Sequence, residues 1–530
     1  MMKNKSHTRF AELSLFWITS CCILSYLIIF ALFNFWGFAR FCNSDVYADC
    51  QVAVRMWEQK TLFPNGWTFG NQFYVIATPV LAAGLYGLTG NIQLAMALAT
   101  QIMTFLILLS FVWMLRGFES NALHQALACL LLISSIVTPW GPSSLNTLLF
   151  FTQSSFYACY LITLFIVLGD YTRCLVSNKL RPISWGISVV LCFATGIQSL
   201  RQLAITILPI FAYEVFNAIR CILRRNSIRI CDFRFRMFRA VSYAAANLAG
   251  AAAIKLWSIP SATIYGSLQP SGELSQKLSQ IANAILEITS LDYILQGDYS
   301  RFLALVILFM VGIGLVGCLI WLSRIFQKED GLEQCWILLL IGIIGVFLAT
   351  LVLDITLRSI YIFMWFPLVA LSGILITRKL PKFARYAWVV LVCAVSTASL
   401  FYCYFPSLQL MKEPLPSEAQ LSQWAVDNGY EYVYGEYWGT APQIAVYSQG
   451  KLDAGCWHGS ENVYQVELAN TPQDIYSAAQ NEKALYVFTS EDVQNGLQCA
   501  QEKGVSMELK VQFGDFRAYT ASKPLMYTNS

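Results

Sequence analysis

The feature that most constrains the fold is a series of long apolar segments along the first three quarters of the chain. About 20 apolar residues are enough for a helix to cross the roughly 30 Å hydrocarbon layer of a membrane. Eleven segments qualify, at residues 13–37, 91–115, 122–138, 147–169, 183–199, 202–219, 240–258, 302–323, 334–353, 359–377 and 387–405. Residues 73–88 are apolar too, but Pro79, the glycines and the polar flanks predict a re-entrant or juxtamembrane helix there. The sequence therefore predicts a polytopic α-helical membrane protein with about eleven transmembrane helices.

The composition agrees with this class. Only 12% of the 530 residues are charged, against about 25% in an average soluble domain, and the mean hydropathy is +0.54. The net charge of +4 does not indicate a nucleic-acid partner. The informative quantity in a membrane protein is which loops carry the Lys and Arg residues.

The distribution of these cations predicts the orientation. With eleven spans and a cytoplasmic N-terminus, every inner loop holds Lys or Arg, as the positive-inside rule requires. The Arg-rich stretch 220–239 is then an orientation signal near anionic lipid. The first span is too long for a signal-peptide core and is expected to be an uncleaved anchor. The loop 38–90 and the C-terminal part of the chain are predicted to lie outside the cytoplasm.

The hydropathy falls at about Pro406, which divides the chain into a transmembrane domain (1–405) and a second domain (406–530). Ser417-Glu-Ala-Gln420 is a capping box before a helix that ends near Asn428, and another helix is expected from Ser490. Strands are expected at residues 431–434, 443–447, 485–488 and 507–513. These elements predict a small extracytoplasmic α/β domain.

Four of the 16 cysteines lie in the predicted outer segments. Cys42 and Cys50 bracket the acids of the first loop, and Cys456 and Cys499 lie in the last domain. Because an extracytoplasmic compartment permits disulfides, we expect these two pairings. Three scattered histidines and the absence of a CxxC motif give no sign of a His- or Cys-based zinc site.

Two acids follow the first span, in Asn43-Ser-Asp45-Val-Tyr-Ala-Asp49. Carboxylates beside a membrane span are costly unless they are solvated, paired or used. If Asn43 or Ser44 caps a short helix, residues 45 and 49 share one of its faces. Asp45 can then act as a general base, while Asp49 orients it or helps to hold a metal. The alternative is a pair of solvated acids at a helix start.

Three cations are predicted at the same side of the membrane. Arg201 lies in the turn after the fifth span, Arg358 follows the ninth, and Lys255 lies near the outer end of the seventh. A guanidinium at the membrane surface suits capture of a lipid phosphate. The alternatives are snorkelling side chains and, for Arg358, an ion pair with Asp354.

Two aromatic residues are candidates for contact with a sugar or an acceptor. Tyr47 lies between the two acids, and Trp438 belongs to an aromatic cluster that begins at Tyr430. Aromatic faces can stack on sugar rings, although alternating tyrosines in a strand are also ordinary sheet packing.

The order of these features resembles the GT-C superfamily of membrane glycosyltransferases, in particular bacterial protein O-mannosyltransferases and lipid A aminoarabinose transferases. The resemblance covers roughly residues 10–405. Its motifs are Ser44-Asp45-Val-Tyr-Ala-Asp49, the stretch from Pro79 to Tyr86-Gly-Leu-Thr-Gly90, Arg201 in the hairpin after the fifth span, and Arg358-Ser-Ile-Tyr361 before Pro367.

The resemblance implies an inverting glycosyltransferase of the bacterial inner membrane that uses a polyprenyl-phosphate sugar. The acceptor would be an envelope glycan, lipid or protein. Asp45 would be the base, Asp49 a supporting acid, and Arg201 and Arg358 phosphate contacts. Arg201 stands where some members have Lys, and Gln72 supplies no further acid, so no cofactor is expected and a divalent metal, although possible, is not supported.

Two other classes of function remain open. A transporter or flippase for lipid-linked saccharides would place paired polar groups at mid-membrane depth and break helices in repeated halves. A non-catalytic envelope scaffold would bind glycan through its outer domain, and replacing Asp45 would leave its function intact.

Overall fold

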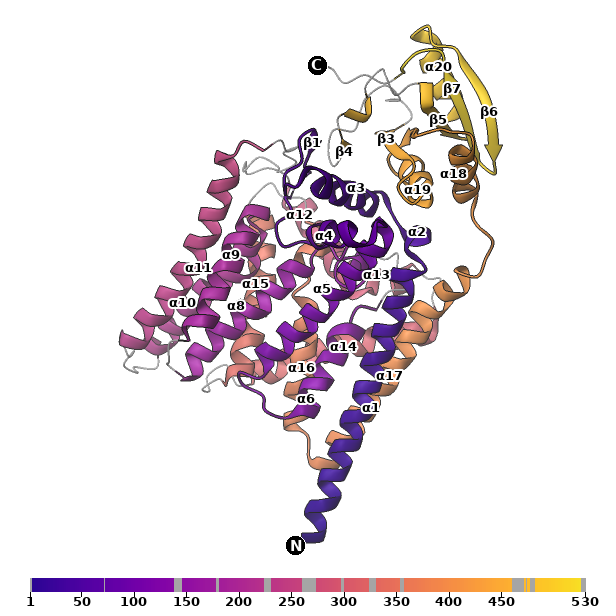
Figure 1. The fold of residues 1–530 in the computed structure, drawn as a ribbon. Helices are drawn as coiled ribbons and strands as arrows, with labels where there is room; N and C mark the ends of the chain where they lie inside the picture. The colour runs from indigo at the N-terminus through magenta and orange to yellow at the C-terminus, as the bar shows by residue number, and fades with distance from the viewer. Residues whose placement is uncertain are drawn as a thin grey trace.

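Helices dominate the chain, and a small sheet near the C-terminus lies at one end of the helix bundle (Figure 1). The structure is a computed structural model. It describes residues 2–70, 72–137, 145–177, 181–223, 230–259, 273–296, 300–323, 330–352, 357–459, 471–472, 474–476 and 482–525.

Every predicted apolar segment overlaps a helix of the bundle. These helices are α1 (Met2–Phe35), α5 (Ile92–Leu115), α6 (Ala122–Ser134), α8 (Ala158–Ser177), α9 (Pro182–Gln198), α10 (Leu208–Leu223), α11 (Ile230–Leu256), α14 (Arg301–Leu322), α15 (Gly331–Val352), α16 (Trp365–Lys379) and α17 (Lys382–Leu410). Within the described residues, 7 helices are long and apolar enough to cross a membrane, and three apolar helices are shorter. The chain is a multi-pass membrane protein, and the count of eleven spans stays a prediction.

Shorter helices connect or cover the bundle. They are α2 (Phe38–Phe41), α3 (Ser44–Gln59), α4 (Thr78–Thr89), α7 (Leu145–Leu148), η2 (Leu203–Ile207), α12 (Leu274–Thr289), α13 (Leu291–Leu295) and η3 (Ser359–Ile362). The 12 residues of α4 extend about 18 Å, which is less than the hydrocarbon thickness. Its Gly87 lies against α3, because a Cβ there would be 2.2 Å from the Trp57 ring.

The predicted span 147–169 starts later in the structure. Helix α8 begins at Ala158, and the preceding residues form turns with positive φ at Gln153 and Ser155. These turns are buried and polar, and they find partners elsewhere in the bundle: the Gln153 backbone N–H donates to Asn34 Oδ1 at 2.7 Å. Polar residues that bond across the bundle replace the first turns of the expected helix.

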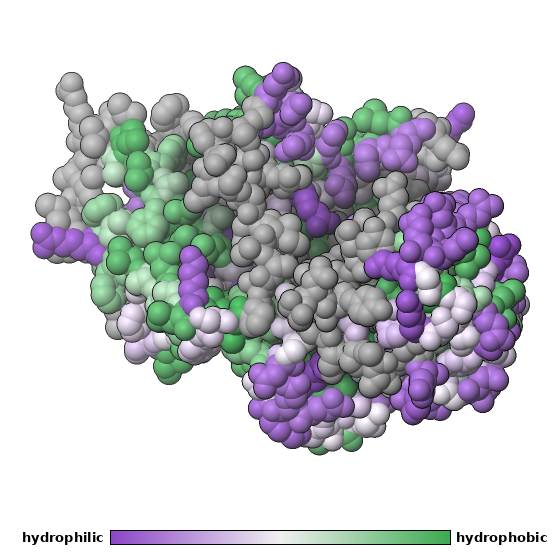
Figure 2. Space-filling model, turned by 90° about the horizontal axis from the view of Figure 1, so that it is seen from above, coloured by the Kyte–Doolittle hydropathy of each residue, from purple (hydrophilic) through white to green (hydrophobic). Residues whose placement is uncertain are grey.

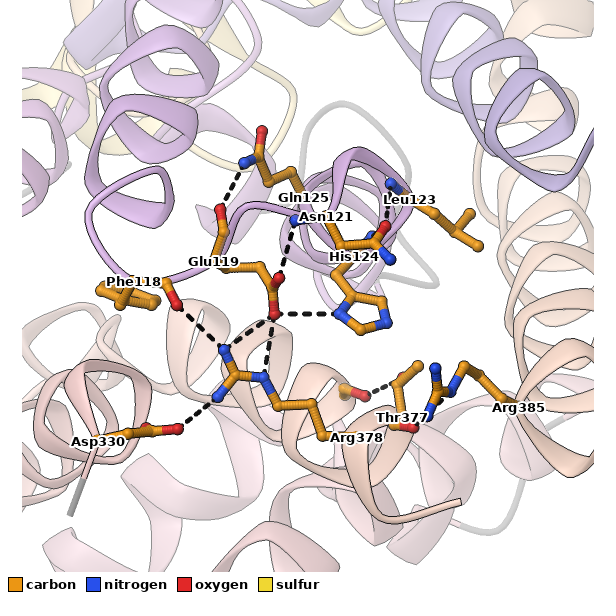
Figure 3. A network of polar contacts seen from close by, with 11 residues as sticks. Phe118, Glu119, Asn121, Leu123, His124, Gln125, Asp330, Thr377, Arg378 and Arg385 are labelled. Atoms are coloured by element: carbon orange, nitrogen blue, oxygen red, sulfur yellow. Dashed lines mark hydrogen bonds and ion pairs between the residues drawn. The ribbon is translucent and has the colours of Figure 1, made fainter. Parts of the chain in front are cut away.

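A polar network joins three connections at the end of the bundle opposite the sheet (Figure 3). Buried Glu119, between α5 and α6, accepts from the Asn121 N–H at 2.9 Å and lies 3.0 Å from His124 Nδ1. Arg378, at the end of α16, bonds both Glu119 at 2.9 Å and Asp330 at 2.6 Å. Burial opposes the ionisation of Glu119, but these bonds outweigh it and lower its pKa to about 2. The network therefore holds the ends of α5, α6, α15 and α16 together.

The C-terminal part folds around a five-stranded sheet of order β3-β2-β5-β7-β6. Strand β2 (Tyr432–Glu436) is parallel to β3 (Asp453–Trp457) and β5 (Ala484–Thr489), whereas β7 (Phe516–Ala521) is antiparallel to β5 and to β6 (Met507–Phe513). Helices α18 (Ser417–Asp427), α19 (Ala441–Tyr447) and α20 (Val493–Glu502) accompany it, with η5 (Asp474–Tyr476).

The expectation of a strand at 443–447 was wrong. These residues lie in α19, which begins beside Pro442 and packs between the sheet and α3. Proline in the first turn of a helix costs no hydrogen bond, and the helix connects the parallel strands β2 and β3, as such a crossover requires.

The sheet domain is docked on the first loop. Tyr47 of α3 accepts from the Ala454 N–H at 3.2 Å and donates to Leu452 O at 3.4 Å. Strand β1 (Trp67–Thr68) pairs with β4 (Thr471–Pro472). Seen from above, hydrophilic residues cover the side that carries the sheet domain, and hydrophobic residues are prominent on the opposite side (Figure 2).

The two predicted disulfides do not form, because all four cysteines are free thiols. Cys42 and Cys50 pack in the same buried cluster, but the Cys42 thiol donates to Asn43 O at 3.4 Å instead of bonding Cys50. Cys456 packs among residues between the sheet and α19, whereas Cys499 packs with the cluster on the other face of the sheet.

Candidate active site

The acidic motif forms the first turns of α3. Asn43 is its N-cap, and its side chain accepts from the Val46 N–H at 2.9 Å. Asp45 therefore lies in the first turn, where the helix dipole favours a negative charge. Asp49 follows one turn later on the same face. The predicted capped helix is confirmed.

Asp45 is half-buried and bonded to the C-terminal domain. The Tyr437 hydroxyl donates to Asp45 Oδ1 at 2.9 Å. Burial raises the pKa of Asp45, while the Tyr437 hydrogen bond and the positive charge of Arg358 oppose this rise. The net effect is a carboxyl group whose pKa lies above its ordinary value, in the direction that strengthens it as a base.

Asp49 lies inside the protein, with 2% of its surface exposed. Burial raises its pKa to about 7, against the opposing effect of the Tyr74 and Ser154 hydroxyls, and the negative charge of Asp45 adds to the rise. Its Oδ2 is buried without a hydrogen-bond partner. Asp49 is thus enclosed by its neighbours, one helical turn after Asp45.

Arg201 lies where α9 ends and the chain turns towards η2. Its guanidinium donates to Gln72 Oε1 at 2.7 Å, and its Cζ lies 5.2 Å from the Tyr157 ring centre and 5.8 Å from that of Tyr361. Gln198 fixes the first loop to this hairpin by accepting from the Ile76 N–H at 2.8 Å. Aromatic rings and one amide oxygen therefore hold the cation in place.

Arg358 is exposed and directly precedes η3. Its charge acts on Asp45, as noted above, and also on Tyr157. Burial raises the pKa of Tyr157, and the charges of Arg201 and Arg358 both oppose that rise. Arg358 therefore acts on both Asp45 and Tyr157, and Arg201 lies beside the Tyr157 ring. Asp354, the alternative partner of Arg358, lies outside the described residues.

The other predicted residues lie in different settings. Lys255 is exposed in the last turn of α11, and none of the described contacts that join the acid and the two arginines involves it. The Tyr47 hydroxyl is engaged by the β3 backbone, as described above. Trp438 is 51% exposed and packs edge-on against Tyr437 at 4.8 Å. Their roles in binding stay predictions.

Several residues of the site were not predicted to belong to it from the sequence, and Tyr437 was assigned only to the aromatic cluster that begins at Tyr430. Tyr437 contacts an acid 392 positions away in the sequence, and Tyr74, Ser154 and Tyr157 likewise come from distant segments. Gln72, noted only for lacking a charge, bonds Arg201. A tyrosine just after a predicted strand was the available signal for Tyr437, because loops at the carboxyl ends of parallel strands often carry functional side chains.

In the part of the chain that the structure describes, no three His, Cys, Asp or Glu residues are grouped so that they could hold a metal ion. The candidate site combines a carboxyl group at a helix start, a tyrosine donor and two guanidinium groups. Such a set can accept a proton on one side and bind an anion on the other.

Known proteins resemble this chain in structure. No protein-family model matches the sequence, and a comparison with curated proteins finds no match either. The crystal structure of ArnT from Cupriavidus metallidurans bound to undecaprenyl phosphate is similar over 93% of this chain and 97% of that chain, with a TM-score of 0.51 and 11% identity. The archaeal oligosaccharyltransferase AglB from Archaeoglobus fulgidus is similar over 88% and 69% of the two chains, with a TM-score of 0.46 and 12% identity. The likeness to ArnT, at this low identity, shows that the two chains share a fold.

Proposed function

We propose that the protein is a glycosyltransferase that takes a sugar from a polyprenyl-phosphate carrier. The observation that carries this proposal is Asp45 at the start of α3, bonded by Tyr437 and acted on by the charge of Arg358, which acts with Arg201 on Tyr157 as well. The ArnT structure of the same fold contains undecaprenyl phosphate, which supports a lipid-linked donor. The acceptor would be an envelope glycan, lipid or protein on the extracytoplasmic side of the bacterial inner membrane.

The chemistry follows from the two sides of the site. An acceptor hydroxyl attacks the anomeric carbon of the donor and gives its proton to the Asp45 carboxylate. The bond between the anomeric carbon and the phosphate oxygen breaks, and its electron pair leaves with the polyprenyl phosphate. Arg201 and Arg358 stabilise the charge that develops on this phosphate. One displacement from the opposite face inverts the anomeric carbon.

The two arginines differ in how firmly they are held. Arg201 is bonded to Gln72 and surrounded by Tyr157, Tyr160 and Tyr361, so we assign it the fixed phosphate contact. Arg358 is exposed, and its positive charge acts on the Asp45 carboxyl group. We therefore assign it to the phosphate oxygen that leaves the anomeric carbon.

The test is sugar transfer by the purified protein in lipid, with a panel of radiolabelled polyprenyl-phosphate sugars. Arg201→Gln and Arg358→Gln should each lower kcat/KM by about 10- to 100-fold, the usual effect of losing a charged hydrogen bond to a developing anion. The matched control is Arg116→Gln, because Arg116 is exposed at the end of α5 away from the site.

Two results would contradict the proposal. Wild-type protein that consumes no donor, while labelled lipid-linked saccharide crosses the bilayer, would favour the transporter. If the Arg201 and Arg358 variants transfer sugar as fast as the Arg116→Gln control, these arginines do not bind the donor phosphate.

A further inference from the structure

Tyr437 is the residue through which the C-terminal domain reaches the candidate base. It directly follows β2, and its hydroxyl donates to Asp45 Oδ1 at 2.9 Å. The main chain of Tyr437 is fixed on both sides: its N–H donates to Trp457 O at 2.8 Å, and its carbonyl accepts from the Ser44 hydroxyl. Side chain and backbone are therefore both held against the first turn of α3.

The direction of this hydrogen bond is set by chemistry. Burial and the neighbouring negative charge of Asp45 raise the pKa of Tyr437 above its ordinary value, so the phenol keeps its proton. The tyrosine is then the donor and the carboxylate the acceptor. Such a bond stabilises the ionised form of Asp45 and fixes one of its two oxygens, which leaves the other oxygen for a proton.

The docking of the domain does not depend on this hydroxyl. Gln443 of α19 donates to the Ser44 hydroxyl at 3.3 Å, and the Tyr47 hydroxyl bonds the backbone of residues 452 and 454. Arg40 donates to Pro414 O at 2.8 Å, in the segment that connects α17 with α18 at the start of the domain. Loss of one phenolic oxygen at position 437 should therefore leave the domain in place.

We propose that Tyr437 is a positioning residue of the active site, through which the C-terminal domain fixes the Asp45 carboxylate for proton abstraction. The inference rests on the proposed transferase function. It makes the sheet domain a part of the catalytic apparatus, in addition to any contact with the acceptor.

Strand β2 offers a matched control. Tyr434, three residues earlier, is also buried, and its hydroxyl donates to Ile475 O within the sheet domain. Tyr434→Phe and Tyr437→Phe thus each remove one buried hydroxyl from the same strand region. Only the second change removes a hydrogen bond to Asp45.

The experiment measures transfer of the radiolabelled sugar against pH by wild type and both variants. Tyr437→Phe should lower kcat/KM by about 10- to 100-fold, mainly through kcat, because a hydrogen bond to a charged group is lost. The acid limb of its profile should move to higher pH, since Asp45 loses a donor that favours its ionised form. Tyr434→Phe should match wild type in both respects.

Besides Tyr437, the charged and titratable groups that interact electrostatically with Asp45 are Arg358, Asp49 and Tyr74. Neither Tyr437→Phe nor Tyr434→Phe changes any of these three residues. Combining Tyr437→Phe with Asp45→Asn adds a second readout, because a residue that acts through Asp45 causes no further loss once Asp45 is gone.

The outcomes separate this inference from the function on which it rests. Wild-type transfer with an unmoved pH profile in Tyr437→Phe would overturn the positioning role, as would an equal loss in Tyr434→Phe. A further loss in the double variant would show that Tyr437 acts elsewhere. A wild-type protein that transfers no sugar would instead overturn the proposed function.

Discussion

At the scale of residues, the two acids of α3 lie in different surroundings. Asp45 is half-buried and accepts a tyrosine hydrogen bond, whereas Asp49 is 2% exposed and keeps one oxygen unpartnered. Carboxyl groups in unlike environments take unlike protonation states. Near neutral pH the buried acid is partly protonated, because burial raises its pKa to about 7, and a proton on Asp49 reduces its repulsion of negative charge on Asp45.

The raised pKa of Asp49 predicts a pH-dependent stability. The native state keeps a proton between the ordinary pKa of 3.8 and about 7, whereas the unfolded chain releases it. The free energy of unfolding therefore falls as pH rises through this window, by on the order of 4 kcal/mol. The neutral side chain of Asp49→Asn removes this dependence, so the Tm of the variant should fall less between pH 5 and pH 8.

Thermal unfolding in lipid at a series of pH values checks this expectation. Asp427→Asn is the control, because Asp427 is exposed on α18 and should give a Tm curve parallel to that of wild type. Parallel curves for wild type and Asp49→Asn would show that Asp49 is not held protonated in the native state.

At the scale of elements, the Arg201 hairpin depends on a close crossing of α9 and α11. A Cβ at Gly196 would lie 2.1 Å from the Asn247 carbonyl oxygen, and one at Gly250 would lie 2.2 Å from the Phe193 carbonyl oxygen. Small residues let membrane helices approach until their backbones touch. Gly196 lies in the last turn of α9, two residues before the helix ends at Gln198, so the crossing sets the position of the turn that carries Arg201.

Gly196→Ala should disturb that turn. Backbone atoms cannot yield as a side chain can, so the added methyl group should destabilise the protein by about 1–3 kcal/mol and raise the KM for the donor. Gly186→Ala on the same helix is the control, because nothing lies within 4 Å of its added Cβ. The measurement is the Tm and the KM for the donor of both variants. Equal values for Gly196→Ala and Gly186→Ala would mean that the crossing of α9 and α11 does not position Arg201.

At the scale of the whole molecule, the sequence predicted what depends on local pattern. Apolar length located the helices of the bundle, and Asn43 predicted the start of α3. Lys and Arg placement predicted an orientation that stays a prediction. Two local predictions failed because contacts with distant segments outweighed the local pattern. The expected first turns of the helix before Ala158 are buried polar turns, and residues 443–447 form the helix α19, packed against α3, instead of a strand.

The assembly of the site could be predicted only in part. The acid, the hairpin arginine and the late arginine were expected on one side of the membrane. In the structure Arg358 acts on Asp45, and both arginines act on Tyr157, while their joint role in one site stays a prediction. Contacts between Asp45 and Tyr437, or between Arg201 and Gln72, join segments whose sequence separations are 392 and 129. No periodicity encodes such pairs, because they arise from how the sheet domain and the first loop pack on the bundle.

The most direct test of the account is a single-turnover measurement of sugar transfer by Asp45→Asn, with the exposed Asp427→Asn as matched control. The substitution removes the proposed base while Tyr437, Arg201 and Arg358 remain. General-base catalysis contributes about 10²- to 10⁴-fold, so transfer by Asp45→Asn should slow by a factor in this range, with the folded fraction unchanged. Transfer at the control rate would contradict the account, because Asp45 would then not take the acceptor proton.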